Sequence, residues 1–202
     1  MKIVDQTVTL EWITPDAMEV LESAARTCYK SEDKIGPGSA EKLVRHILDL
    51  KDESILEHAS ARFRFVTDRG VTHELVRHRL ASFSQESTRY CNYSKDKFSN
   101  EISVVKPVNL DCEEGEYVWN QSCRDAEESY FHLLKLGYSP QLARSVLPNS
   151  LKTEIVVTAN FREWRHIIKL RTSPAAHPQI QALISTVKGM LIAEYPLIFE
   201  NI

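Results

Sequence analysis

Two stretches of this chain change from strand-type to helix-type residue spacing within a few positions, which restricts the fold to classes that mix strands and helices. Residues 59–67 alternate in the manner of a half-buried strand, and residues 71–79 then have helical spacing. Residues 153–158 are rich in β-branched side chains, and Asn160 can cap a helix over residues 161–170. Both stretches predict a strand that leads directly into a helix.

The remainder of the chain carries further strand and helix signals. A first strand is predicted over residues 2–10, a short turn over 54–57 and extended chain over 83–93. Helices are predicted over residues 15–30, from Ser39 onward, and over 113–136, 140–147 and 175–194. With no repeat, low-complexity tract or linker, residues 1–202 are expected to form a single α+β domain, in which a mixed or antiparallel sheet packs against several helices.

Composition narrows the class of protein. A chain of 202 residues with 43% hydrophobic and 26% charged residues has the composition of a soluble globular protein, not of a disordered or disulfide-stapled one. Its apolar runs are shorter than a membrane span of about 20 residues, and its N-terminus lacks the pattern of a signal peptide. We therefore expect a cytoplasmic protein that binds no membrane, with four free thiols at Cys28, Cys91, Cys112 and Cys123.

Charge is distributed unevenly along the chain, although the net charge is only −3. Residues 62–89 carry six arginines against three acidic residues, and residues 141–171 carry six cations against two. Residues 101–128, between these two segments, carry eight acidic residues and two cations. Two arginine-rich segments could fold into one anion site, because guanidinium groups match phosphate and carboxylate geometry. Glycine-rich phosphate loops are excluded, since neither of their motifs occurs.

The residues from His73 onward resemble the zinc-protease motif, but their histidine spacing differs from it. His73 and Glu74 begin an H-E-x-x-H-like run, but the second histidine, His78, comes one residue too late. Five residues along a helix rotate the two rings by about 140°, so they do not share a face. No metal site is expected.

The arginine-rich segments contain two candidate ligand-binding sets. If the chain after Arg79 is extended, Gln85, Ser87 and Arg89 lie on one face and combine an amide, a hydroxyl and a guanidinium. The second set is a polar stripe on the predicted helix 161–170, opposite its apolar side. Its members are Arg162, Arg165, His166 and Lys169. Spacing alone leaves open that both sets are ordinary solvated surfaces.

The arrangement of these residues resembles a known signature. Arg77-His78-Arg79, then seven residues, then Ser87, with Arg89-Tyr90 following, is similar to the signature of the flavin-dependent thymidylate synthases. Other segments resemble further motifs of that family in the expected order, so the resemblance covers about residues 26–180. These segments are residues 53–58, residues 143–148, Asn160-Phe161-Arg162 and Lys169-Leu170-Arg171.

The resemblance implies a reaction and an assembly. Members of this family methylate dUMP reductively to dTMP, with methylenetetrahydrofolate as the carbon donor, FAD as the hydride carrier and NADPH as the reductant. They are homotetramers whose active sites take residues from several subunits.

The resemblance also implies site residues. The family's substrate positions fall on Glu74, Arg77, Gln85, Glu86, Ser87, Arg89, Arg144 and Arg171. Its flavin positions fall on Ser54, Arg77, His78, Arg79, Gln85, Asn160, Arg162 and His166.

Two of the residues that the resemblance implies have roles consistent with the chemistry of this reaction. Methylation at C5 of uracil needs electron density on that carbon, and a guanidinium can stabilise the ring deprotonated at N3. Arg171 is the candidate for this catalytic role. Ser87 has no sequence-adjacent base, and an unactivated hydroxyl is a weak nucleophile, so we expect it to position the substrate.

The chain departs from the commonest family pattern at a few positions. Ser84-Gln85-Glu86-Ser87 replaces the usual Asn-Glu-x-Ser, so an amide stands at position 85 where a carboxylate is usual. Glu74 stands where some members have glutamine, and His166 where asparagine is also found. Two alternative functions remain at this point: a catalytically inactive flavin- or nucleotide-binding relative, and an arginine-rich nucleic-acid-binding module. The net charge of −3 and the lack of a recognisable motif argue against nucleic acid.

Overall fold

The computed structural model describes residues 1–95 and 98–202, and the chain divides into two compact units. Unit 1 consists of Met1–Thr7, Phe65–Arg77 and Ser84–Val156. Unit 2 consists of Val8–Arg64, His78–Phe83 and Val157–Ile202.

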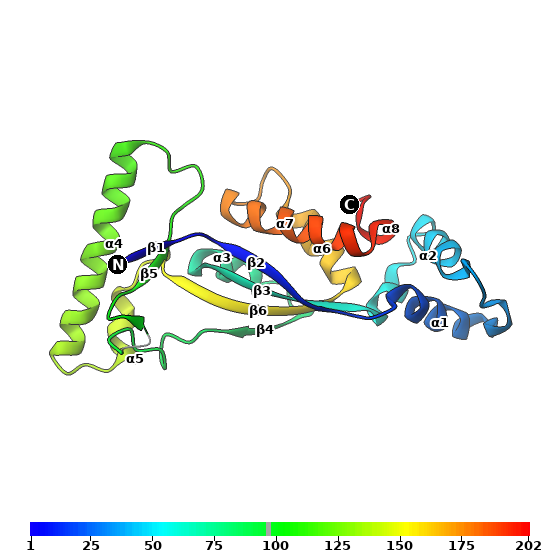
Figure 1. Ribbon diagram of the computed structural model, residues 1–202, viewed down its shortest axis with the longest axis horizontal. Helices are drawn as coiled ribbons and strands as arrows, with labels where there is room; N and C mark the ends of the chain where they lie inside the picture. Colours follow the sequence, from blue (N-terminus) through cyan, green and yellow to red (C-terminus); the bar gives the residue numbers. More distant parts are fainter. Residues whose placement is uncertain (96–97) are drawn as a thin grey trace. The chain divides into compact units, whose positions relative to one another are not determined.

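The larger sheet has four strands, in the order β2-β3-β6-β4 (Figure 1). Every second residue of β3 and β6 is buried, as expected for strands with one face against a core. The strands predicted over residues 59–67 and 153–158 are therefore confirmed, and so is an α+β fold with an antiparallel sheet. The strands are β2 (Thr7–Ile13), β3 (Ser60–Asp68), β6 (Lys152–Asn160) and β4 (Ala81–Gln85).

Unit 1 contains a second, two-stranded sheet and the longest helix, α4 (Glu113–Lys135). Strand β1 (Lys2–Val4) pairs in parallel with β5 (Ser103–Val105), which the sequence patterns did not predict. The other helical elements are α3 (Arg69–Leu75), α5 (Pro140–Ala143) and the 3₁₀ turn η4 (Arg144–Val146). Its core comprises Tyr93, Ile102, Val104, Cys123, Tyr130, Ala143 and Leu151.

Unit 2 is mainly helical. Its two 3₁₀ turns are η1 (Glu32–Lys34) and η2 (Glu53–His58), the second of which contains the predicted turn. Its helices are α1 (Ala17–Tyr29), α2 (Ser39–Asp49), α6 (Phe161–Arg171), α7 (Pro178–Glu194) and α8 (Pro196–Phe199). Of these, only the short α8 has no counterpart in the sequence patterns.

Helix α6 is anchored through its apolar side. The ring of Trp164 is fully buried, packs edge-on against Phe63 at 4.9 Å between ring centroids, and donates its indole N–H to the carbonyl of Ala61 at 3.0 Å. Phe161 packs against Phe199 of α8 at 5.2 Å. These contacts hold α6 against β3 and the C-terminal helix, and they leave its opposite side polar.

Helix α1 begins at Ala17, two residues later than the sequence predicted. Thr14 precedes the predicted first residue and is of a type that caps helices, but its hydroxyl bonds to the backbone of Ser60 instead, accepting from the N–H at 2.8 Å and donating to the carbonyl at 3.2 Å. Asp16 then adopts a left-handed conformation with φ of 49° before the helix starts. A long-range contact has therefore displaced a local capping signal.

The prediction of extended chain over residues 83–93 is wrong beyond Gln85. Glu86 makes a sheet-type bond to the carbonyl of Glu154, and the chain then turns, with the N–H groups of Tyr90 and Cys91 donating to the carbonyl of Ser87. Gln85, Ser87 and Arg89 therefore do not share one face by strand alternation.

Three further element boundaries also differ. The predicted strand over residues 2–10 is two strands, β1 and β2. Helix α3 ends at Leu75, so residues 77–79 lie beyond it. Helix α7 begins at Pro178 because the side chain of His177 caps it, accepting the N–H of Gln179 at 3.2 Å.

All four cysteines are free, as predicted.

Within residues 1–95 and 98–202, no helix combines the length and the apolar character needed to cross a membrane.

Replacing Trp164 with alanine is expected to lower the free energy of unfolding by about 3–5 kcal/mol, because it removes a fully buried ring and its hydrogen bond. Urea denaturation followed by circular dichroism measures the loss. Trp12→Ala, at a ring that is 42% exposed, is the matched control, with an expected change of about 0.5 kcal/mol or less. Equal losses in both variants would contradict the anchoring role.

Candidate functional site

The polar side of α6 carries the stripe that the sequence predicted. Asn160 caps the helix, with its Oδ1 accepting the N–H of Glu163 at 2.8 Å. Four apolar residues of α6 are buried on one side, whereas Arg162, His166 and Lys169 are exposed on the other and Arg165 is half-buried.

A cavity of about 660 Å³ opens on this side of α6 within unit 2. Two carboxylates of η2 pair with the stripe: Glu57 with Arg162 at 2.6 Å and Glu53 with Arg165 at 3.0 Å. Three of the predicted flavin positions line the cavity and are thereby brought together. The lining consists of Glu53, Glu57, Leu80, Asn160, Arg162, Glu163, Arg165, His166, Lys169, Asn201 and Ile202.

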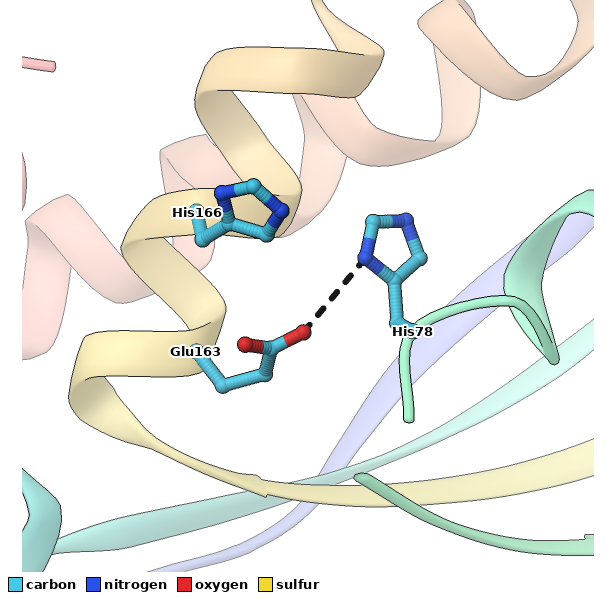
Figure 2. A group of neighbouring side chains, drawn as sticks. All are labelled: His78, Glu163 and His166. Atoms are coloured by element: carbon cyan, nitrogen blue, oxygen red, sulfur yellow. Dashed lines mark ion pairs between the residues drawn. The ribbon is translucent and has the colours of Figure 1, made fainter. Parts of the chain in front are cut away.

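A buried imidazole links the end of α6 to its beginning. His78 is only 4% exposed; its Nε2 accepts the Nε–H of Arg171 at 3.0 Å, and its Nδ1 lies 3.4 Å from a carboxylate oxygen of Glu163. Figure 2 shows this contact and the ring of His166 beside it, 5.7 Å away between ring centroids. The structure thus brings together Arg171, the predicted catalytic residue, and two predicted flavin positions, His78 and His166.

The environment of His78 keeps its ring neutral. Burial lowers the pKa of His78 from 6.5 to about 4, and the nearby charges of Arg171 and His166 act in the same direction. Burial also raises the pKa of the Glu163 carboxyl above its ordinary 4.5, against an opposing effect of His166. At neutral pH an uncharged imidazole therefore lies between a guanidinium and a buried carboxyl group.

His78, Glu163 and His166 place three potential metal-ligand atoms within 4.8 Å of one another. Their hydrogen bonding does not suit a metal. The lone pair on Nε2 of His78 is already used by Arg171, so Nδ1 carries the proton and has no lone pair for a cation. The two histidines of the zinc-protease-like run do not lie on one helix, because His73 is on α3 and His78 lies beyond its end at Leu75.

In unit 1, two arginines are held next to the turn that contains Ser87. Arg144 donates to the hydroxyl of Thr88 at 3.2 Å, and Arg89 donates to the side chain of Gln141, in α5, at 3.2 Å. The hydroxyl of Ser87 accepts the backbone N–H of Arg89 at 3.3 Å. Arg144, which lies 56 positions after Thr88, is therefore held beside the turn that carries two other predicted substrate positions, Ser87 and Arg89.

Two buried threonines hold the side-chain amide of Gln85. Its Nε2 donates to the hydroxyls of Thr72 at 3.0 Å and Thr153 at 3.3 Å. Because these bonds use the two amide protons, the group that Gln85 can present to a ligand is its carbonyl oxygen, a hydrogen-bond acceptor. In this respect it matches the carboxylate that is usual at this position in the resembled family.

The other predicted positions are more dispersed. Glu86 is paired with Lys152 at 3.3 Å, Glu74 is half-buried on α3, and Arg77 is exposed beyond that helix. In unit 2, Arg79 is exposed and the hydroxyl of Ser54 bonds to Asp52 at 3.0 Å. The structure does not join these five residues into a single cluster within either unit.

Several residues of these clusters were not predicted. Thr72, Thr88 and Thr153 support the predicted residues, and a lone threonine in a sequence carries no signal of such a role. Glu163 could have been noticed, because Asn160 and Glu163 have the spacing of a capping box. Its contact with His78, 85 positions away, has no counterpart in local sequence.

Comparison with known proteins assigns the family. The sequence model described as "Thymidylate synthase complementing protein" matches residues 9–197. The flavin-dependent thymidylate synthase of Mycolicibacterium gilvum is 34% identical over 95% of this chain and 83% of its own length. The chain belongs to the flavin-dependent thymidylate synthase family. The enzyme of that name from Mycobacterium tuberculosis is 36% identical over 90% of this chain and 78% of its own.

Solved structures share the fold. Thymidylate synthase X from Helicobacter pylori, solved with FAD and dUMP, superposes with a TM-score of 0.77 at 25% identity, covering 97% of this chain and 98% of that one. A UMP/dUMP methylase from Streptomyces cacaoi has a TM-score of 0.83 at 24% identity, covering 99% and 96%. The second likeness concerns the fold alone.

The low pKa of His78 predicts how stability depends on pH. The unfolded chain takes up the imidazole proton near pH 6.5, whereas the folded protein does so only near pH 4. The contribution of His78 is therefore fully present above about pH 6.5 and is lost as the pH falls through 4. We expect the free energy of unfolding, measured with urea, to decrease across this window.

The raised pKa of Glu163 changes stability with pH in the opposite direction to His78, so a variant is needed to isolate the effect of His78. His78→Asn cannot titrate and is expected to weaken the dependence on pH between 6.5 and 4. The same slope in the variant and the parent would assign the effect to other groups.

Proposed function

We propose that this protein is a FAD-dependent thymidylate synthase, which methylates dUMP reductively to dTMP. The observation that carries the proposal is the pair of arginines held beside Ser87 within a chain that belongs to this family. A relative of the same fold was solved with both FAD and dUMP.

The substrate's phosphate is assigned to unit 1. Arg89 and Arg144 are exposed, and each is oriented through a hydrogen bond to a neutral side chain, so their charge is not cancelled by those partners. Guanidinium groups bind phosphate through parallel N–H donors, and the hydroxyl of Ser87 adds one more polar group. Arg77, Gln85, Glu86 and Glu74 complete the proposed substrate set.

Arg171 is proposed to act on the pyrimidine. A guanidinium next to the ring stabilises the negative charge that develops when N3 is deprotonated, which raises the electron density at C5. Arg171 is half-buried, and its Nε–H donates to the neutral imidazole of His78.

The cavity of unit 2 suits FAD. Its cations can bind a pyrophosphate, and the ring of His166 with the exposed side chain of Leu80 offers surfaces for a flat aromatic group. Asn160, Arg162, His166, His78, Arg79 and Ser54 are proposed to hold the cofactor, with Arg77 and Gln85 of unit 1. When bound, FAD supplies the hydride that completes the methyl group.

Further features of the proposal follow from family membership. They are methylenetetrahydrofolate as the carbon donor, NADPH as the reductant, a homotetramer with shared active sites, and a single domain of this kind over residues 1–202. The match over residues 9–197, which spans both units, supports the single domain. Val76, Leu80 and Tyr90 are large, apolar and exposed around the signature, which supports subunit association there.

An inactive relative is the less favoured function. The sequence hint toward it was the amide at position 85, but Gln85 presents an acceptor oxygen, as the usual carboxylate does.

The proposal predicts a yellow protein whose flavin spectrum changes when dUMP is added. We expect NADPH oxidation that depends on dUMP, and dTMP formation when methylenetetrahydrofolate is also present. Absorption spectroscopy and chromatography of the nucleotides measure these. A protein that binds neither FAD nor dUMP, but shifts nucleic acid in gels in a salt-dependent way, would support the nucleic-acid-binding alternative instead.

Arg171→Ala is expected to lower kcat by about 100-fold or more, because it removes the cation that stabilises the developing charge. Steady-state assays with saturating dUMP measure the loss. Arg124→Ala is the control, because Arg124 is exposed on α4 and bonds to Asn120. An unchanged kcat in Arg171→Ala would remove the catalytic assignment while leaving the family intact.

A further inference from the structure

A buried carboxylate in the first turn of α6 has no role in the function described so far. Glu163 is the third residue after the cap Asn160, and its side chain is 7% exposed. In a capping box, a glutamate at this position turns back to the N–H of the cap residue. Here a carboxylate oxygen of Glu163 is instead directed at Nδ1 of His78, 3.4 Å away (Figure 2).

The partners of His78 determine which of its nitrogens carries the proton. The guanidinium of Arg171 remains protonated and can only donate, so Nε2 of His78 must offer its lone pair. In a neutral imidazole the proton then resides on Nδ1, where it faces the acceptor oxygen of Glu163. If that acceptor were removed, the proton on Nδ1 would lose its partner, and the tautomer with a proton on Nε2, which cannot accept from Arg171, would become less disfavoured.

We propose that Glu163 is a positioning residue, which holds His78 in the Nδ1–H tautomer so that Nε2 orients the guanidinium of Arg171 toward the substrate. The effect on catalysis rests on the proposed role of Arg171, whereas the tautomer does not. Glu163 itself makes no contact with the substrate in this scheme.

Two features of the structure support this role. Burying a carboxylate is costly, and one that only capped a helix would be more stable in contact with water. Glu163 remains buried at a helix N-terminus, where the dipole favours negative charge and partly offsets the desolvation. The low pKa of His78 acts with it, because a protonated ring would have a hydrogen on both nitrogens and could not accept from Arg171.

The test is a double-mutant cycle on dUMP binding and turnover. We expect Glu163→Ala to lower kcat, and with it kcat/KM, by about tenfold, within the range of coupled neighbours. Glu163→Gln keeps an acceptor oxygen for Nδ1–H and is expected to recover most of kcat/KM. In the Arg171→Ala background, adding Glu163→Ala is expected to cause no further loss.

A second measurement does not depend on activity. In the parent protein, ¹⁵N NMR of labelled histidine is expected to show His78 with its proton on Nδ1, and Glu163→Ala is expected to increase the Nε2–H tautomer. If the parent fails to convert dUMP, the proposed function fails, and the NMR spectra still decide the tautomer. Parent spectra with the proton on Nε2, or an unchanged tautomer in Glu163→Ala, would overturn the proposal.

Glu22→Ala separates positioning from a merely structural effect. Glu22 is also a buried carboxylate of unit 2, 4% exposed and paired with Arg26 at 2.8 Å. Its loss is expected to lower stability without changing kcat or the tautomer of His78. If Glu163→Ala behaves in the same way, or if its loss is additive with that of Arg171→Ala, Glu163 has no positioning role.

Discussion

The burial of one side of α6 is the constraint on which the candidate site depends. Trp164 is fixed by ring packing against Phe63 and by a hydrogen bond to the backbone of β3. A helix fixed in rotation on one side has its other side fixed as well, because successive residues are about 100° apart. The cations of the stripe, and Arg171 at the helix end, therefore have defined directions before any ligand binds.

The arginines of α6 differ in the charge of the groups that they contact. Arg162 and Arg165 are each paired with a carboxylate of η2, whereas Arg171 is bonded to an uncharged imidazole. A neutral acceptor orients the Nε–H of a guanidinium without adding an opposite charge at that atom. The carboxyl group that completes this arrangement, Glu163, is separated from the guanidinium by the imidazole ring.

Unit 1 uses neutral partners in the same way. Thr88 and Gln141 orient Arg144 and Arg89, and two buried threonines turn the amide of Gln85 so that its oxygen can face a ligand. Threonine and glutamine supply hydrogen bonds without opposing charge, which keeps the local potential positive. A departure from the family's usual residue at position 85 is thus accommodated by the residues beneath it.

The sequence by itself determined the order of the main elements, the polar and apolar sides of α6, and the family, because periodicity, capping residues and short motifs are local properties. It did not determine where Thr14 bonds, that the chain turns after Gln85, or that α3 stops before Arg77. Thr14 bonds to Ser60, a residue distant in the sequence, and the turn after Gln85 is closed by bonds to the carbonyl of Ser87 that strand alternation does not predict. The same holds for the contacts of His78 with Arg171 and Glu163, since only the folded chain brings residues some 90 positions apart within hydrogen-bonding distance.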